Sequence, residues 1–295
     1  MTDRLVVAGA SGFLGSRLVA AATSRGFEVV QLVRRPPEGP GQRRWDPDKG
    51  ELDPTILEGA TAVVNLCGVG VGDKRWDDAY KALILSSRVV PTDLISRKVA
   101  ATGVPVLINA SAVGYYGPRG EEIINESAQV GNTFLAGVCR QWEAATAPAE
   151  EAGARVVHLR TGLALGSDGG LLPRLSTIVK LFIGGRLGSG KQYFPWISAT
   201  DWTDAVLHLV TAEATGPVNL TGPAPVTNKE FTHQLGKVLG RPTPWMVPEF
   251  ALKVVLGEFA QEVTAGQRAI PAVLEDSGFI FSHATLNEAL RAEIR

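Results

Sequence analysis

The sequence contains few cysteines and few histidines. Only two cysteines, Cys67 and Cys139, occur in 295 residues, and neither stands in a CxxC motif or at metal-ligand spacing. This pattern argues against a disulfide framework and predicts two buried thiols in a reducing cytoplasm. The histidines are scattered along the chain and indicate no metal site. They are His158, His208, His233 and His283.

The chain also lacks an excess of charge of either sign and any long hydrophobic run. Lys and Arg together number 29 and Asp and Glu together 30, so the net charge is -1 at pH 7. This balance does not indicate a nucleic-acid-binding surface, and it favours a small-molecule partner. No segment approaches the ~20 apolar residues that a membrane span needs. Because the first expected strand begins near residue 4, we find no room for a secretion signal and expect a soluble, cytoplasmic protein.

Hydrophobic residues and glycine are plentiful. The hydrophobic fraction is 45%, and the chain carries 33 glycines without an internal repeat. A chain of this length can form one large α/β domain, or a nucleotide-binding domain with a smaller partner.

The stretch from Leu5 to Gly15 is the most informative part of the sequence. A short apolar run breaks at Gly9, Gly12 and Gly15 and resumes with apolar residues at helical spacing, which predicts strand, tight turn and helix. This is the entry to a dinucleotide-binding βαβ unit, in which a pyrophosphate approaches the main chain at a helix N-terminus. The alternative is a glycine-rich turn without a ligand. The residues expected to contact the cofactor here are Gly9, Ser11, Gly12, Phe13, Leu14 and Gly15.

The second expected strand, residues 28–33, ends in Arg34 and Arg35. NAD enzymes usually have an acidic residue at this position, which binds the ribose 2′-hydroxyl, whereas arginine pairs with a 2′-phosphate. The sequence therefore favours NADP over NAD. An exposed basic loop is the competing interpretation, because a segment rich in proline and glycine follows.

Two further segments are expected beside the dinucleotide. The strand over residues 62–68 should bring its carboxyl end, Leu66-Cys67-Gly68, along the cofactor. The helical pattern over residues 76–104 contains Pro91 and is expected to be kinked or divided there. Arg88 on this segment could hold phosphate or ribose, or it could be a solvated arginine.

Hydroxyl side chains follow the next buried strand, residues 105–111. Ser111 stands at its carboxyl end, and the pair Tyr115-Tyr116 comes just beyond, so these hydroxyls are expected in the active crevice. A helix over about 133–151 and a strand over 154–160 follow. The strand leads into a turn with Ala164, which is expected on the cofactor side.

After Gly166 the chain changes character and becomes rich in glycine. We therefore predict an α/β protein with a Rossmann doubly wound parallel sheet in residues 1–165 and a smaller C-terminal α+β substrate region in residues 166–295. The segment Gly188-Ser189-Gly190-Lys191-Gln192 lacks the spacing of a nucleoside-triphosphate-binding loop. A triphosphatase is therefore excluded.

Together these motifs resemble the extended short-chain dehydrogenase/reductase superfamily, and more closely its atypical "epimerase family" branch of nucleoside-diphosphate-sugar epimerase-like and cell-division-inhibitor-related proteins. The resemblance spans nearly the whole chain. The stretches that carry it include Gly9 to Gly15, Asn65 to Gly68, Arg75-Trp76, Ser87-Arg88, Tyr115-Tyr116-Gly117, Phe134-Leu135 with Trp142-Glu143, Arg160 to Gly166, Leu187 to Gln192, Phe194 to Ile197, Asn219-Leu220 and Gly278-Phe279 with Phe281.

The resemblance implies a Rossmann domain that holds NADP and a C-terminal region that closes over a small substrate, with Gln192 and Trp196 toward the substrate. For Trp196 a place in the core is the alternative. Related proteins use a Tyr-x-x-x-Lys pair for proton transfer. The corresponding helix, residues 133–139, has neither residue, and Ser198 stands where related chains often have histidine.

Two functions are consistent with these observations. One is an NADP-dependent oxidoreductase or epimerase-like enzyme acting on a small polar substrate, such as a nucleotide-sugar or carbonyl compound, with Ser111 and Tyr115 as candidate proton donors. The other is a catalytically silent NADP-binding sensor or regulatory protein. The missing Tyr and Lys favour the second, whereas the glycine-rich loop and the aromatic residues of the C-terminal region favour the first.

Overall fold

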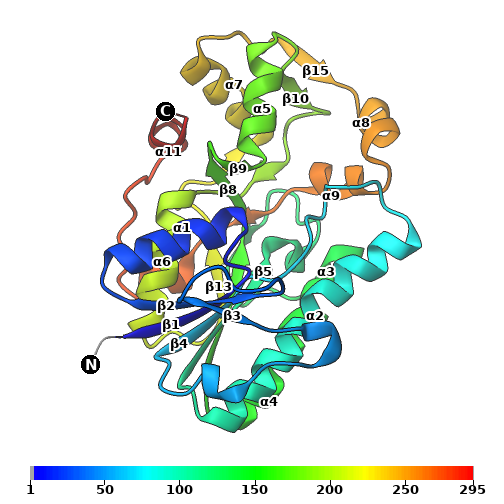
Figure 1. Cartoon of the computed structure of the whole chain (residues 1–295). Helices are drawn as coiled ribbons and strands as arrows, with labels where there is room; N and C mark the ends of the chain where they lie inside the picture. The colour runs from blue at the N-terminus through cyan, green and yellow to red at the C-terminus, as the bar shows by residue number, and fades with distance from the viewer. Residues whose placement is uncertain (1–2, 295) are drawn as a thin grey trace.

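The computed structural model describes residues 3–294 and is organised around a seven-stranded, fully parallel sheet (Figure 1). The strands lie in the order β3-β2-β1-β4-β5-β7-β13, so the direction of winding reverses between β1 and β4. This is the doubly wound Rossmann order, and it confirms the predicted fold class. The strands are β1 (Arg4–Ala8), β2 (Glu28–Val33), β3 (Gln42–Arg44), β4 (Ala62–Asn65), β5 (Val106–Ala112), β7 (Arg155–Thr161) and β13 (Gly216–Leu220).

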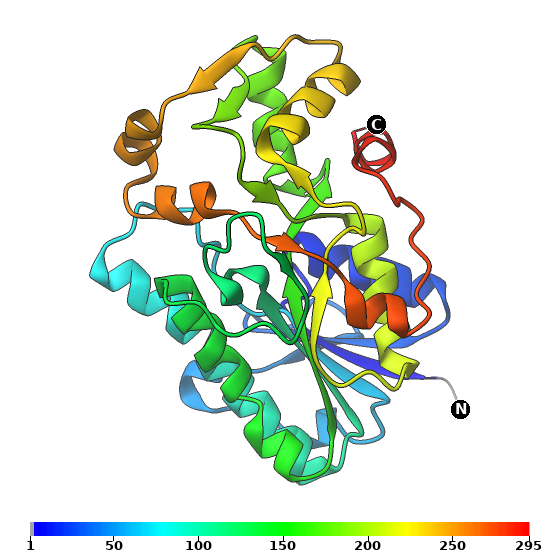
Figure 2. The ribbon, with the colours of Figure 1, turned by 180° about the vertical axis from the view of Figure 1, so that it is seen from behind.

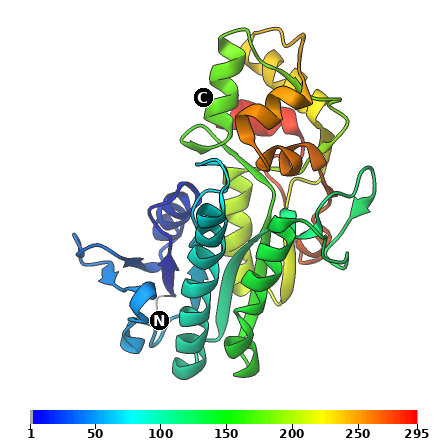
Figure 3. The same cartoon turned by 90° about the vertical axis from the view of Figure 1, so that its right-hand side faces the viewer.

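Helices cover both faces of the sheet, as Figures 1 and 3 show. One face is covered by α1 (Phe13–Ser24), α6 (Ala199–Thr211) and α10 (Ala272–Asp276). The other is covered by α2 (Asp78–Thr102), α3 (Phe134–Ala144) and α4 (Ala147–Glu151). Short 3₁₀ helices occur at Pro47–Lys49, Pro54–Ile56 and Val113–Tyr116.

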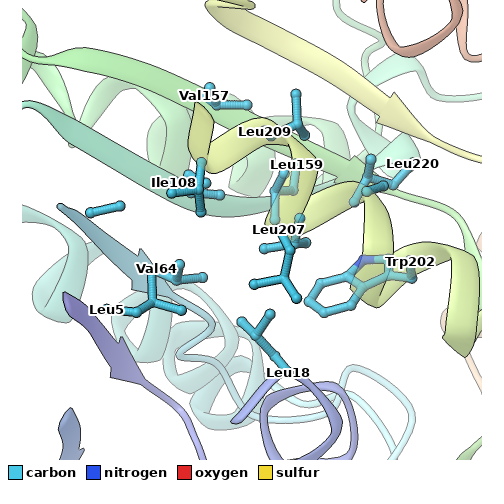
Figure 4. Packing of buried hydrophobic residues seen from close by; sticks show 14 of the residues in the cluster. Leu5, Leu18, Val64, Ile108, Val157, Leu159, Trp202, Leu207, Leu209 and Leu220 are labelled. Carbon is cyan, nitrogen blue, oxygen red and sulfur yellow. The ribbon is translucent and has the colours of Figure 1, made fainter. Parts of the chain in front are cut away.

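The alternation of side chains along the strands produces two cores. In β1, Leu5 and Val7 pack with Leu18 of α1 and Trp202 of α6, whereas Val6 faces the α2 side. Figure 4 shows the first of these clusters, in which side chains from the sheet, α1 and α6 meet. Strands buried on both faces read as continuous apolar runs, which is why the sequence pattern located them correctly.

Helix α2 runs as one element over Asp78–Thr102, although Pro91 lies inside it. The predicted division near residue 90 is not observed. The helix begins at Asp77, whose carboxylate accepts from the Tyr80 N–H at 2.7 Å, and ends at Gly103 with φ +70°. Among the described residues, no helix is both long and apolar enough to cross a bilayer.

The C-terminal region lies on the side of the sheet where its strands end (Figures 1 and 2). Its strands are β8 (Leu163–Gly166), β9 (Gly169–Gly170), β10 (Gly185–Leu187), β11 (Tyr193–Phe194), β12 (Trp196–Ser198), β14 (Val226–Thr227), β15 (Trp245–Val247) and β16 (Arg268–Ala269), which pairs with β6 (Ile123–Ile124). Its helices are α5 (Leu172–Lys180), α7 (Asn228–Leu239), α8 (Glu249–Leu256), α9 (Phe259–Ala265) and α11 (Leu286–Glu293).

The boundary between the Rossmann domain and the C-terminal region was predicted at residues 165 and 166. In the structure, segments after this boundary belong to the Rossmann domain as well. After β12 the chain returns to the sheet, because α6 packs in the sheet core and β13 pairs with β7 as the edge strand. The apolar pattern at residues 218–220 is typical of a short strand, but the partner of β13 cannot be read from local pattern.

Candidate functional site

The turn after β1 is closely packed against neighbouring backbone at two of its three glycines. Gly9 has φ +79°, and a Cβ there would lie 2.7 Å from the Leu66 carbonyl oxygen. A Cβ on Gly15 would overlap the carbonyl oxygen of Gly9. At Gly12 a Cβ would meet only the Gly9 oxygen at 3.4 Å. Gly9 and Gly15 are therefore required by the protein itself, whereas Gly12 leaves a space open at the N-terminus of α1.

A cavity of about 510 Å³, here called the first cavity, opens beside this turn. It brings together many of the predicted cofactor residues from three strand ends: Gly9, Ser11 and Gly12 after β1, Arg34 and Arg35 after β2, and Leu66, Cys67 and Gly68 after β4. Burial raises the pKa of the Cys67 thiol to about 12, so this side chain is a neutral wall of the cavity.

The two arginines lie at the edge of the first cavity beside the end of β2. Both are exposed, and the Arg35 Nη1 pairs with the Glu38 carboxylate at 2.8 Å. The end of β2 carries no acidic residue, although Asp48 from the 3₁₀ helix after β3 also lines the cavity. Arg34 and Arg35 therefore lie at the position where dinucleotide-binding proteins distinguish the ribose 2′-hydroxyl of NAD from the 2′-phosphate of NADP.

Other lining residues were not identified in the sequence. They include Gln42, Trp45, Pro47, Asp48, Leu83, Ser86 and Ser87. Trp45 and its neighbours reach the cavity because β3 pairs with β2 beyond the proline-rich loop. Ser86 and Ser87 directly precede Arg88 on α2. Their position next to this predicted cofactor residue is the one sequence feature that could have identified them as cavity residues.

Phe13, Leu14, Gly15 and Ala164 do not line the first cavity. The Phe13 ring lies against the β8–β9 hairpin, where Cβ atoms on Gly166, Gly169 or Gly170 would crowd it. Leu14 packs against the sheet core. These residues therefore set the position of α1 relative to the C-terminal region.

Arg88 lies beneath the loop after β4 and is largely buried. Its guanidinium donates to the Ile84 and Val69 carbonyl oxygens, both at 2.9 Å, and stacks over the Trp142 ring at 5.0 Å. Burial lowers the pKa of Arg88. Arg88 is not among the residues that line the first cavity, and its contacts support the backbone of the Gly68–Val69 turn.

Ser111 belongs to a buried charge network. Its hydroxyl donates to Glu143 Oε1 at 2.6 Å, and the Glu143 carboxylate is bound bidentately by Arg160, with both N–O distances 2.9 Å. Burial lowers the pKa of Arg160, but hydrogen bonding and charge pairing with Glu143 outweigh it, and the resulting pKa lies above its usual value. The Ser111 hydroxyl therefore points to protein groups in this structure.

The two tyrosines after Ser111 occupy different environments. Tyr116 is fully buried, and its hydroxyl donates to Asn219 Oδ1 at 2.7 Å and accepts from Arg160 at 3.0 Å. Burial raises its pKa to about 12. Tyr115 is half-buried, and the Arg160 guanidinium stacks 3.5 Å from its ring centroid. A cation next to Tyr115, which the sequence did not show nearby, is thus supplied through the fold.

A smaller cavity of about 240 Å³, here called the second cavity, lies where the C-terminal region meets the ends of β5 and β7. Leu135 of α3 lines it, from the helix where related enzymes have tyrosine. Cys139, one turn further on, is buried, and its pKa is raised by burial to about 12. The lining residues are Val113, Gly114, Leu135, Thr161, Gly162, Leu163, Leu171, Tyr193, Phe194, Pro195, Phe259, Glu262, Val263, Gly266 and Gln267.

The two residues predicted on the substrate side, Gln192 and Trp196, do not line this cavity. Trp196 is 1% exposed, and its Nε1 donates to the Ala224 carbonyl oxygen at 3.0 Å, so it is a core residue. Gln192 donates to the Leu187 carbonyl oxygen at 3.0 Å. Neither is retained in the proposed substrate site. Among residues 3–294, no group of three or more His, Cys, Asp or Glu is arranged to hold a metal ion.

The sheet order and the glycine turn at its switch point define a protein of the Rossmann dinucleotide-binding class. The family model described as the NAD dependent epimerase/dehydratase family matches residues 5–221. The chain belongs to this family. Residues 247–293 match a second model, described as a domain of unknown function.

Similar proteins extend over nearly the whole chain. An epimerase family protein of Mycobacterium leprae is 46% identical over 97% of this chain and 94% of its own length. The crystal structure of human epimerase family protein SDR39U1 (isoform 2) with NADPH has a TM-score of 0.90, 29% identity and 98% coverage of both chains. A nucleoside-diphosphate sugar epimerase from Corynebacterium glutamicum has a TM-score of 0.83 and 38% identity, covering all of this chain and 58% of that one.

Proposed function

We propose that the protein is a cytoplasmic, NADP(H)-binding oxidoreductase or epimerase-like enzyme acting on a small-molecule substrate. The observation that carries this proposal is the first cavity, where the open position above Gly12 faces a space lined by Arg34 and Arg35. A pyrophosphate fits at the N-terminus of α1, where the backbone N–H groups and the helix dipole favour negative charge. The similarity to a protein crystallised with NADPH supports the same assignment.

The residues of this chain would bind and orient the cofactor. Gly9, Ser11 and Gly12 would hold the pyrophosphate, the arginines would pair with the 2′-phosphate, and the turn at Leu66–Gly68 would pack along the dinucleotide. When bound, NADP(H) supplies two-electron redox chemistry.

The arginine pair allows a direct test of cofactor selection. Replacing both Arg34 and Arg35 with Ala should weaken NADPH binding by about 10- to 100-fold, since hydrogen bonds to charged groups contribute about 1.5–3 kcal/mol. NADH binding should change less than threefold. Fluorescence titration of the variant with both cofactors measures the ratio. Arg43→Ala, an exposed arginine on the neighbouring strand β3 and outside the cavity lining, is the matched control. An unchanged NADPH-to-NADH preference would contradict the assignment.

Catalytic proton transfer is the second part of the proposal. Ser111 and Tyr115 are the candidates, and Tyr115 is preferred because the Ser111 hydroxyl already donates to Glu143, whereas the half-buried Tyr115 ring lies against the Arg160 guanidinium. Tyr115→Phe should keep NADPH binding and reduce turnover at least ~100-fold, within the range for general acid–base catalysis. Full turnover by this variant on a substrate that wild-type protein converts would exclude Tyr115.

A catalytically silent NADP(H)-binding sensor is the second candidate function. The observation that favours it is α3, which presents Leu135 to the second cavity and buries Cys139 one turn away. The two functions are separated by incubating wild-type protein with NADPH and a panel of carbonyl compounds. Tight binding without cofactor oxidation across the panel supports the sensor, and oxidation dependent on one compound supports the enzyme.

A further inference from the structure

The second cavity differs from the first in its charge. None of its lining residues within the described part of the chain is Lys, Arg or His, and one, Glu262, is acidic. The first cavity, by contrast, is lined by two arginines and by the glycine turn at the start of α1. The features that attract phosphate are therefore concentrated on the cofactor side.

Three helices begin at the wall of the second cavity, which is lined by Leu135 of α3, by Leu171 before α5 and by Phe259 of α9, and Glu262 lies beside the first of these helix starts. Helix α3 begins after Thr133, and Leu135 lies in its first turn. The Glu262 side chain of α9 lies close to this helix start, beside Thr133 and Leu135. An anionic ligand at the start of α3 would therefore meet the negative charge of this carboxylate.

The remaining wall is mainly apolar. Side chains of Val113, Leu163, Phe194, Phe259 and other apolar residues surround the space. The volume of about 240 Å³ lies below the roughly 300–1,000 Å³ of pockets that hold drug-sized ligands.

Few polar groups are available to a ligand in this space. Thr161 and Gln267 already hydrogen-bond to protein groups. Tyr193 and Glu262 are the other polar lining residues. The Tyr193 hydroxyl can donate a hydrogen bond to a neutral oxygen, whereas the Glu262 carboxylate opposes an anionic group.

We propose that the second cavity binds a small, uncharged, largely apolar carbonyl compound, oriented by Glu262 and Tyr193, and that it excludes phosphorylated substrates, including nucleotide-sugars. This proposal rests on the proposed function, because it names the substrate class of the same site. Under this proposal, the substrate of this chain is not a nucleoside-diphosphate sugar, although the chain is similar in fold to the nucleoside-diphosphate sugar epimerase of Corynebacterium glutamicum.

The test compares three probes on purified full-length protein saturated with NADPH: acetophenone, phenyl phosphate of similar size, and UDP-glucose. Saturation-transfer NMR measures binding independently of turnover. We expect acetophenone to bind at least about tenfold more tightly than phenyl phosphate, a ratio that corresponds to 1.4 kcal/mol, and UDP-glucose not to compete. Leu135→Trp should fill the cavity and abolish acetophenone binding while NADPH binding persists.

Glu262→Gln tests the role of the carboxyl. It should narrow the ratio between acetophenone and phenyl phosphate at least threefold, because the amide is close in size to the carboxylate and carries no negative charge. Glu258→Gln, on the same segment but outside the cavity lining, should leave the ratio unchanged.

Three results would overturn the proposal: UDP-glucose or phenyl phosphate binding as tightly as acetophenone, no acetophenone binding, or acetophenone binding unaffected by Leu135→Trp. The NADPH titration that precedes the experiment reports on the proposed function separately. Failure there removes the cofactor assignment, whereas failure with the probes alone removes only the substrate class.

Discussion

Glu143→Ala should lower the free energy of unfolding by about 3–5 kcal/mol, the cost of removing one partner of a buried ion pair. Glu143 receives two hydrogen bonds from Arg160 and one from Ser111, and Arg160 is only 3% exposed. Without the carboxylate, the guanidinium would remain as a buried charge lacking a partner of opposite sign. Urea unfolding followed by circular dichroism measures the change.

Arg97→Ala is the matched control for this prediction. Arg97 pairs with Asp93 one helical turn away on the exposed side of α2, and surface pairs of this kind contribute about 0.3–0.5 kcal/mol. A loss for Glu143→Ala no larger than that of the control would show that the network is not a stabilising element of the core.

The second large effect concerns Gly12. Gly12→Val should weaken NADPH binding roughly 100-fold or more, equivalent to about 2.7 kcal/mol, because the side chain would occupy the space above the turn. The free energy of unfolding should change by no more than about 1 kcal/mol, since the residue has ordinary helix-cap geometry and no protein atom lies within 3.4 Å of the added Cβ. Cofactor fluorescence and urea unfolding provide the two readouts.

Substitutions at two other glycines serve as controls for Gly12→Val. Gly15→Val should destabilise the fold as well, because its Cβ would overlap the Gly9 carbonyl oxygen. Gly39→Val, in an open part of the loop after β2, should alter neither property. If Gly12→Val bound NADPH like the wild-type protein, the turn could not be the pyrophosphate site.

Local sequence pattern was sufficient for much of the fold. The buried strands β1, β4, β5 and β7 each contain a short apolar run, and the order of these runs along the chain made a doubly wound sheet predictable. The glycine spacing and the arginines after β2 gave the cofactor side, because their positions follow from where strands end.

The positions that were misjudged depend on contacts between distant segments. Trp196 is placed in the core by β12 pairing with β8 and by its bond to Ala224. Arg88 is turned toward Val69 and Trp142 rather than the first cavity. Glu262 is distant in sequence from α3 and lies near the start of that helix only in the folded protein. No local motif therefore indicated that Glu262 belongs to the candidate site.

The most direct test of the account is equilibrium titration of purified wild-type protein with NADPH and NADH, followed by nicotinamide fluorescence. The account predicts saturable binding of one NADPH per chain, with NADPH bound at least about tenfold more tightly than NADH, the ratio that 1.4 kcal/mol represents. Absence of saturable binding of either dinucleotide would contradict it.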